Sequence, residues 1–309
     1  MRAAGITAFG AAVELLELPD PRPPAADELL IRVRAAAVAN WDDIVRQGNW
    51  DIGGSLPLAL GVQVAGEVLT AGAATRAFAA GDAVMAHPLP LRDQGAWAEQ
   101  MLIPAEAAAP KPATVDWEEA AAFPVPALTA QQVLTEAVEV QPGETLLVHG
   151  GGGVTGRLLV ALAVRAGARV FATASERSAE RLRAIGAEAV FDYRHAAWQE
   201  ALREHAGAVD AVANAASGGE AAAAAVLRRG GRFATITGAP PEVPAAGRVA
   251  SCYVRPDGAQ LRDLAQMLGS RELGVDVAAV VTLADAAAAL DAAVAATRAG
   301  AIVLQPPAA

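Results

Sequence analysis

Residues 146 to 156 read Leu-Leu-Val-His-Gly-Gly-Gly-Gly-Val-Thr-Gly, and this stretch decides the fold. An apolar strand runs into closely spaced glycines, and an Ala/Leu-rich helix is expected from 154 to 166, stopped by Gly167. Glycines at this spacing allow a tight turn, close approach of the backbone to a pyrophosphate, and close packing of helix against strand. The helix N-terminus adds free N–H groups and a positive dipole end. The expected pyrophosphate-binding residues are Gly151, Gly153, Val154, Thr155 and Gly156.

The segment after the next expected strand, 169 to 174, distinguishes between two dinucleotides. An acidic side chain there would hold a ribose 2′-hydroxyl, whereas cations would hold a 2′-phosphate. The chain has Ser175 where an acid is usual, and Arg177 offers a planar, permanently charged guanidinium to a phosphate. Glu176 would repel a phosphate if it turned inward, although it also fits a solvated turn. The pattern favours NADPH over NADH as the cofactor.

Composition limits the possible partners and sites. The 309 residues suffice for two domains, and 54% hydrophobic against 19% charged residues supports filled cores. A net charge of −10 argues against nucleic acid as a partner, because its binding requires clustered cations. A single cysteine, Cys252, leaves no disulfide framework or thiolate zinc site. The four histidines lie far apart, and we interpret His149, in the strand before the glycines, as a packed structural residue. No metal site is expected.

No stretch resembles a continuous membrane span. The most apolar late segment, Ala278 to Ala296, is interrupted by Asp285 and Asp291. The N-terminus lacks the long apolar region and cleavage site of an export signal. A cytoplasmic protein without a membrane partner is therefore expected.

The spacing of apolar runs predicts two kinds of domain. Up to about residue 110, short apolar runs alternate with Gly, Pro and Asp, which is typical of β-structure. From about 118, strands expected at 145–149, 169–174, 189–192, 209–213 and 231–237 alternate with helices. After Pro256, a helix (259–268), a strand (277–283), a helix (284–296) and a strand (301–304) close the chain. We predict an α/β protein with a β-rich domain at 1–117 and 257–309 and a doubly wound parallel sheet at 118–256.

Several further motifs occur in a fixed order along nearly the whole chain. They are Ala-Asn40-Trp-Asp-Asp43-Ile-Val-Arg46-Gln-Gly48, Leu56-Pro-Leu-Ala-Leu-Gly61-Val-Gln-Val-Ala-Gly66-Glu, Gly81-Asp-Ala-Val, Gly95-Ala-Trp-Ala-Glu99, Pro110-Lys-Pro112, Ala127-Leu-Thr129-Ala and Gln141-Pro-Gly143-Glu. With the glycine loop, the chain resembles the zinc-independent quinone oxidoreductase and enoyl reductase branch of the medium-chain dehydrogenase/reductase superfamily. The resemblance implies a GroES-like catalytic domain interrupted by a Rossmann domain, with the active site in the cleft between them.

The resemblance also bears on the chemistry. Zinc-containing relatives carry a cysteine shortly before the position of Asn40, a His-Glu pair after the glycine that corresponds to Gly61, and a lobe of four cysteines. Here the pair is Val62-Gln63 and the lobe is absent. No Lewis acid is then left to stabilise an alkoxide. The implied reaction is hydride transfer from NADPH to an acceptor that stabilises negative charge itself, such as a quinone or an α,β-unsaturated carbonyl compound (enone).

Four functional residues follow from matching the family motifs. Asn40 matches a cleft asparagine that orients the acceptor or the nicotinamide ribose, although a turn or helix N-cap fits it equally well. Thr129 matches a threonine beside the nicotinamide, with a helix-start threonine as the alternative. Tyr193 matches a tyrosine near the adenosine 2′-phosphate, and Gly238 matches a strand end that faces the nicotinamide.

Departures from the family pattern leave a second hypothesis open. Many quinone reductases have a tyrosine where this chain has Val45, and the usual Gly-Lys near the C-terminus is Gly300-Ala301. A redox sensor or structural relative that binds NADP(H) without significant turnover is therefore the alternative to a reductase. Relatives commonly pair the edge strands of their Rossmann sheets, and the alternating residues Arg248 to Arg255 resemble such an edge. A homodimer is expected.

Overall fold

The chain divides into two compact units. The structure, a computed structural model, describes residues 1–244, 247–296 and 299–307. Unit 1 comprises Met1–Leu128 and Arg255–Ala309, and unit 2 comprises Thr129–Val254. The border falls within helix α3 (Pro124–Gln132), which continues into a π-helical turn at Val133–Ala137.

Unit 1 is built around a seven-stranded, mainly antiparallel sheet. Its strands run in the order β15-β16-β3-β5-β6-β8, and β7 also pairs with β3. The long central strand β3 (Glu28–Val38) is buried along most of its length. The other strands are β5 (Val64–Ala71), β6 (Ala83–Ala86), β7 (Gln100–Pro104), β8 (Ala108–Pro110), β15 (Val277–Thr282) and β16 (Ala301–Gln305). A second sheet has the order β2-β1-β4 and comprises β1 (Arg2–Ile6), β2 (Glu14–Glu17) and β4 (Leu58–Ala59).

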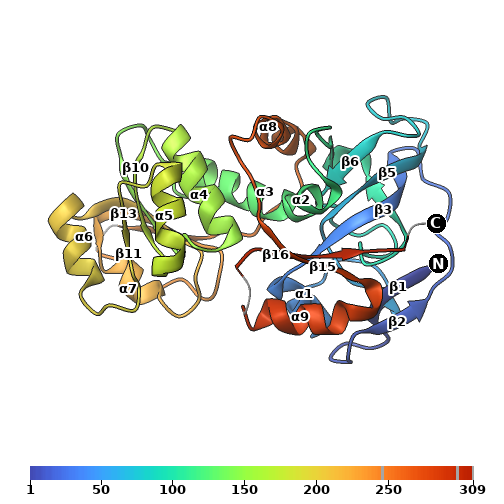
Figure 1. The fold of residues 1–309 in the computed structure, drawn as a ribbon, viewed down its shortest axis with the longest axis horizontal. Coiled ribbons are helices and arrows are strands. Elements are labelled where there is room, and N and C mark those ends of the chain that lie inside the picture. Colours follow the sequence, from blue (N-terminus) through green and yellow to red (C-terminus); the bar gives the residue numbers. More distant parts are fainter. Residues whose placement is uncertain (245–246, 297–298, 308–309) are drawn as a thin grey trace. The chain divides into compact units, whose positions relative to one another are not determined.

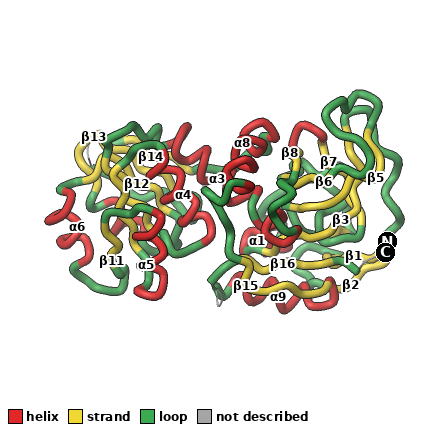
Figure 2. Tube along the Cα trace, turned by 45° about the horizontal axis from the view of Figure 1, so that its top comes forward, coloured by secondary structure: helices red, strands yellow, loops and turns green. Residues whose placement is uncertain are grey.

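The C-terminal segment completes the sheet of unit 1. Strand β16 lies antiparallel to β3, with Ile302 opposite Val38, and β15 extends the sheet beyond it (Figure 1). Helix α9 (Ala286–Val294) packs alongside both strands (Figure 2). The other helices of the unit are α1 (Asn40–Arg46), α2 (Trp117–Ala122) and α8 (Gly258–Gly269), with 3-10 turns at Ala105–Ala107 and Leu283–Asp285. No helix in the described ranges is long and apolar enough to cross a membrane.

Unit 2 is a doubly wound α/β unit. Its six-stranded sheet has the order β11-β10-β9-β12-β13-β14, and all neighbouring strands are parallel. The strands are β9 (Thr145–His149), β10 (Arg169–Thr173), β11 (Ala189–Phe191), β12 (Val209–Asn214), β13 (Leu227–Thr235) and β14 (Arg248–Ser251). The connecting helices are α4 (Val154–Arg165), α5 (Glu176–Ile185), α6 (Trp198–Ala206) and α7 (Glu220–Ala224). Strand β9 is buried throughout, as expected for a parallel strand covered on both faces.

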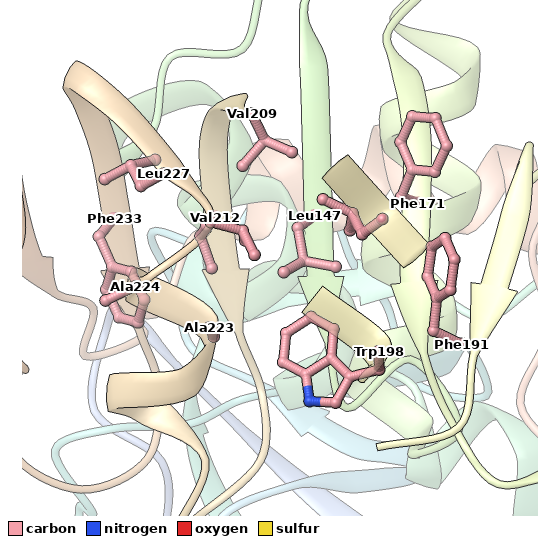
Figure 3. Close-up of a cluster of buried hydrophobic side chains, with 12 residues drawn as sticks. Leu147, Phe171, Phe191, Trp198, Val209, Val212, Ala223, Ala224, Leu227 and Phe233 are labelled. Atoms are coloured by element: carbon pink, nitrogen blue, oxygen red, sulfur yellow. The ribbon is translucent and has the colours of Figure 1, made fainter. Parts of the chain in front are cut away.

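A cluster of buried apolar side chains fills one side of this sheet. Leu147 at the centre of β9 lies near Phe171, Phe191 and Trp198 (Figure 3). Phe171 and Phe191 stack with ring centroids 6.5 Å apart. Burying an aromatic side chain of this size stabilises the fold by about 1.5–3 kcal/mol. This cluster supports the strands from which the glycine loop emerges.

The structure matches the expected α/β class and differs in detail. The five strands expected between 145 and 237 are β9 to β13, and the helix expected at 154–166 is α4. The helix expected at 284–296 begins instead as a 3-10 turn, because Asp285 accepts hydrogen bonds from Thr282. Helix α2 belongs to unit 1, where it packs on β3 and β5, so the observed border lies beyond the expected one at 117/118.

Candidate dinucleotide site

The glycine loop turns at Gly150, one residue before the first glycine of the motif. Gly150 has φ +85°, a left-handed conformation that favours glycine. A Cβ atom at Gly150 would lie 2.8 Å from the Cβ of Ala216 and 3.0 Å from the backbone of Ala215. The sequence motif assigns the tight turn to Gly151, whose φ is not positive in the structure. Motif spacing alone did not identify Gly150, although it belongs to the same run of four glycines.

The last two glycines of the motif have different roles. A Cβ atom at Gly156 would lie 2.2 Å from the carbonyl oxygen of Gly150, so helix α4 can approach the loop this closely only with glycine there. Gly153 is exposed, has φ −77°, and would have no atom closer than 3.7 Å to an added Cβ. The chain itself therefore does not require glycine at 153, and the open space suits a bound pyrophosphate.

The N-terminus of α4 supplies donors beside this space. Gly153 is the N-cap, and Arg157 N–H closes the first helical turn on its carbonyl oxygen at 3.0 Å. The N–H groups of Val154 and Thr155 lie in the first turn, where a helix offers no acceptor of its own. Within the described ranges, the half-buried Thr155 hydroxyl also has no hydrogen-bond partner. These groups fit the oxygens of an anion.

His149 is packed beneath the loop, as the sequence interpretation expects. Its ring is 5% exposed and stacks on Trp198 with centroids 5.7 Å apart. Its Nδ1 lies 2.7 Å from the hydroxyl of Thr173. Burial lowers the pKa of His149, and the nearby Glu220 carboxylate opposes this shift in part. Burial therefore disfavours the charged form of this imidazole.

The corner expected to bind a 2′-phosphate has one uncommitted cation. Ser175 is the N-cap of α5, and its hydroxyl makes no capping hydrogen bond. Arg177 is exposed, and its guanidinium has no ion-pair partner within the described residues. The site residues Ser175 and Arg177 thus present a hydroxyl and a free guanidinium at one helix start.

Tyr193 lies beside a paired arginine. It is 52% exposed, and the Arg194 guanidinium lies 5.9 Å from its ring centroid. Arg194 donates hydrogen bonds to the Asp192 carboxylate, which lower the pKa of Asp192 to about 2. The hydrogen bond to Asp192, and more weakly the charge of Glu176, raise the pKa of Arg194.

Gly238 follows the end of β13 in a left-handed conformation. Its φ is +66°, and an added Cβ would lie 2.9 Å from the Glu220 carboxylate. The residue is exposed. A larger side chain at this position would meet both backbone strain and the start of α7.

In unit 1, Asn40 is the first residue of helix α1 and is exposed. The alternative interpretation of Asn40 as an N-cap is wrong, because Ala39 occupies that position. The Asp42 carboxylate accepts a hydrogen bond from Ala39 N–H at 2.8 Å and thus satisfies the start of the helix. The Asn40 side chain has no hydrogen-bond partner in the described part of the chain.

The other catalytic candidate, Thr129, lies inside a helix. It is 6% exposed and follows five residues of α3, so the interpretation as a helix-start threonine is wrong. Val45, compared above with a family tyrosine, is 1% exposed and belongs to the core of unit 1. Its neighbour Ile44 is 45% exposed, so of these two positions of α1 only 44 presents its side chain to solvent.

The positions of the zinc-binding pair have other roles here. Val62 is buried, and its carbonyl oxygen accepts a hydrogen bond from His87 Nδ1 at 2.7 Å. The buried Gln63 side chain accepts one from Val125 N–H at 3.2 Å, near the start of α3. Burial lowers the pKa of His87 to about 4, so its ring is neutral. Among the described residues, no three His, Cys, Asp or Glu side chains are grouped to hold a metal ion.

Comparisons with known proteins place this geometry in a family. The alcohol dehydrogenase GroES-like domain model matches residues 25–113, and the zinc-binding dehydrogenase model matches residues 185–304. The quinone oxidoreductase of Coxiella burnetii superposes with a TM-score of 0.86 at 25% identity, covering 99% of both chains. The chain belongs to the medium-chain dehydrogenase/reductase superfamily, and within it the chain is similar to quinone oxidoreductases.

Two further proteins are similar to this superfamily member. The rat quinone oxidoreductase is 30% identical over 211 residues, which is 67% of this chain and 63% of the rat protein. A mycobacterial protein solved in complex with NADPH is 29% identical, with a TM-score of 0.84 over 99% of this chain and 100% of that chain. The chain spans less than two thirds of the length of curated relatives such as the rat protein.

Proposed function

We propose that the protein is an NADPH-dependent, zinc-independent oxidoreductase that reduces a quinone or an α,β-unsaturated carbonyl compound. The observation that carries the proposal is Gly153, an exposed glycine that the chain does not itself require, at the start of a helix with free N–H groups. The pyrophosphate would be held by Gly151, Gly153, Val154, Thr155 and Gly156. The similar mycobacterial protein that was solved with NADPH supports this ligand.

The preference for NADPH rests on the start of α5. Arg177 has no ion-pair partner among the described residues, and Ser175 leaves a hydroxyl free beside it. A guanidinium binds a phosphate more strongly than a neutral hydroxyl, because the hydrogen bonds are charge-assisted. Tyr193 would lie on the same adenosine end of the cofactor.

The acceptor class follows from the residues available for chemistry. When bound, NADPH supplies the hydride. Val62 offers no metal-binding side chain, and Gln63 is committed to the backbone of α3. Without a metal ligand set, the acceptor must accommodate negative charge in its own conjugated system, as a quinone or an enone does. The reduction is completed by a proton from water. Asn40 and Thr129 are proposed to orient the acceptor and the nicotinamide, and Gly238 to face the nicotinamide.

Strand β14 is the proposed surface for homodimer formation. It is the last strand of the sheet in unit 2, and no described strand pairs with its outer side. Val249 on this strand is 38% exposed, and Tyr253 after it is 89% exposed. Pairing of two such edges would cover these side chains.

The proposed function is tested by turnover. Purified protein treated with a chelator is mixed with NADPH or NADH and with a set of quinones and enones, and cofactor oxidation is followed by absorbance. Faster oxidation of NADPH with one acceptor class supports the proposal. NADPH binding without oxidation across both classes favours the redox sensor, and turnover that requires added zinc contradicts the proposed chemistry.

A further inference from the structure

Four neighbouring strands of unit 2 end in buried polar residues that stand in register. Thr173 of β10 pairs with His149 of β9, His149 pairs with Asn214 of β12, and Asn214 pairs with Thr235 of β13. Their exposed fractions are 0%, 5%, 1% and 1%, respectively. We refer to these four residues as the polar row. A buried polar group is costly unless it is hydrogen-bonded, so the partners of the row show what it supports.

The first half of the row holds the glycine loop. Thr173 Oγ1 accepts a hydrogen bond from Gly150 N–H at 3.0 Å, and the Thr173 carbonyl oxygen accepts one from Gly151 N–H at 2.9 Å. The same Oγ1 shares a hydrogen bond with His149 Nδ1, 2.7 Å away. Thr173 therefore fixes the first two residues of the loop, and His149 fixes Thr173.

The second half of the row holds the segment from Ile236 to Gly238. Asn214 Nδ2 donates to Thr235 Oγ1 at 3.1 Å and to Thr237 Oγ1 at 3.3 Å. The Thr235 hydroxyl donates to the carbonyl oxygen of Thr237, and the Asn214 carbonyl oxygen accepts from Ile236 N–H at 3.1 Å. Asn214 thus links the end of β12 to the backbone that leads to Gly238.

The two halves lie where doubly wound sheets bind ligands, beyond the carboxyl ends of the strands. Their side-chain hydrogen bonds go to each other, to these two segments and, through Asn214 Oδ1, to Ala216 N–H in the segment after β12 at 3.4 Å. An apolar residue at each strand end would fill the same space and leave those segments free to adopt other conformations.

We propose that the four residues of the polar row are positioning residues, and that its two halves hold two different parts of the cofactor site. Thr173 and His149 hold the loop for the pyrophosphate, and Asn214 with Thr235 holds the segment that faces the nicotinamide. The proposal rests on the proposed function and deepens it. The physical basis is the fraction of molecules whose site has the conformation that can bind. A ligand binds more weakly when this binding-competent conformation is only partly populated.

The test compares two ligands on the full chain. NADPH contains both the pyrophosphate and the nicotinamide, whereas 2′-phospho-ADP-ribose contains the pyrophosphate and lacks the nicotinamide. Thr173→Val keeps the shape of the side chain and removes the hydroxyl, and Thr173→Ser keeps the hydroxyl as the matched control. Asn214→Leu removes the side-chain hydrogen bonds of Asn214 to Thr235 and Thr237. Dissociation constants are measured by calorimetry, and melting temperatures are recorded for each variant.

The expected results separate the two halves. Thr173→Val weakens the binding of both ligands about tenfold, the scale of one lost buried hydrogen bond, whereas Thr173→Ser keeps the affinity of the wild type. Asn214→Leu weakens NADPH and leaves 2′-phospho-ADP-ribose unchanged. The proposal is overturned if Thr173→Val binds both ligands as tightly as the wild type, or if Thr173→Ser binds them as weakly as Thr173→Val. It is also overturned if Asn214→Leu weakens both ligands equally. A wild-type chain that does not bind NADPH overturns the proposed function as well.

Discussion

Gly156 and Gly150 approach each other so closely that a Cβ atom on Gly156 would stand 2.2 Å from the Gly150 carbonyl oxygen. Because that oxygen belongs to the turn and Gly156 to helix α4, this contact sets how closely the helix and strand β9 pack. We expect Gly156→Ala to lower the free energy of unfolding by about 1–3 kcal/mol, the usual cost of overpacking. Urea denaturation of the variant and the wild type measures this difference, and equal stability would show that the loop yields without cost.

Gly153→Ala is the matched substitution in the same loop, with the opposite expectation. The nearest atom to the new methyl group is 3.7 Å away, so the fold should lose less than about 1 kcal/mol, the scale of an N-cap change. The methyl group would occupy the space proposed for the pyrophosphate, and NADPH binding should weaken at least tenfold. Fluorescence titration with NADPH measures the affinity. Binding as strong as in the wild type would place the pyrophosphate elsewhere.

Arg177→Ala should reduce the preference for NADPH. Loss of a charge-assisted hydrogen bond to the 2′-phosphate costs about 1.5–3 kcal/mol, which corresponds to roughly ten- to a hundredfold in the NADPH dissociation constant. The NADH dissociation constant should not change, because NADH lacks this phosphate. Arg183→Ala, at an exposed position in the last turn of the same helix, is the control and should leave both constants unchanged. An equal loss for both cofactors would mean that Arg177 does not contact the 2′-phosphate.

Asp42 should make stability fall as the pH rises. Burial raises the pKa of its carboxyl group from 3.8 to about 8, and the hydrogen bond from Ala39 opposes this only in part. Between pH 3.8 and about 8 the folded state therefore holds a proton that the unfolded state has released, so stability decreases with rising pH in this window. Asp42→Asn is isosteric and does not titrate.

The measurement for Asp42 is the free energy of unfolding of both proteins at pH 5.5 and pH 8. We expect Asp42→Asn to gain stability relative to the wild type over this interval. Parallel pH dependence of the two proteins would show that the Asp42 carboxyl group ionises normally.

Removal of metal should leave the enzyme active. Val62 and Gln63 provide no zinc-binding pair, and Gln63 already supports the backbone of α3. Dialysis against a strong chelator, followed by elemental analysis and a turnover assay, should show less than stoichiometric zinc and unchanged rate. A rate that is lost on dialysis and returns with zinc contradicts the proposed chemistry.

The sequence predicts the parts of this site that are local in the chain. The strand, glycine loop and helix from 145 to 165 are contiguous, and their glycine spacing reflects steric limits that the structure shows directly at Gly156. The sequence does not predict that the turn falls at Gly150. This residue belongs to a run of four glycines, in which spacing does not identify the residue with positive φ.

The sequence does not predict features that depend on residues far apart in the chain. The polar row joins residues 149, 173, 214 and 235, which become neighbours only through the strand order of the sheet. Each is a polar residue at the end of an apolar run, a pattern that does not by itself indicate which of them are neighbours. The N-cap interpretation of Asn40 is wrong for a local reason: the Asp42 carboxylate satisfies Ala39 N–H, so the helix starts one residue earlier than the asparagine suggests.

The most direct test of the account is the affinity of the wild-type chain for NADPH and for NADH, measured by calorimetry at one salt concentration. We predict one NADPH bound per chain and at least tenfold weaker binding of NADH, since the 2′-phosphate would contribute a charge-assisted contact. Absence of NADPH binding, or a preference for NADH, would contradict it.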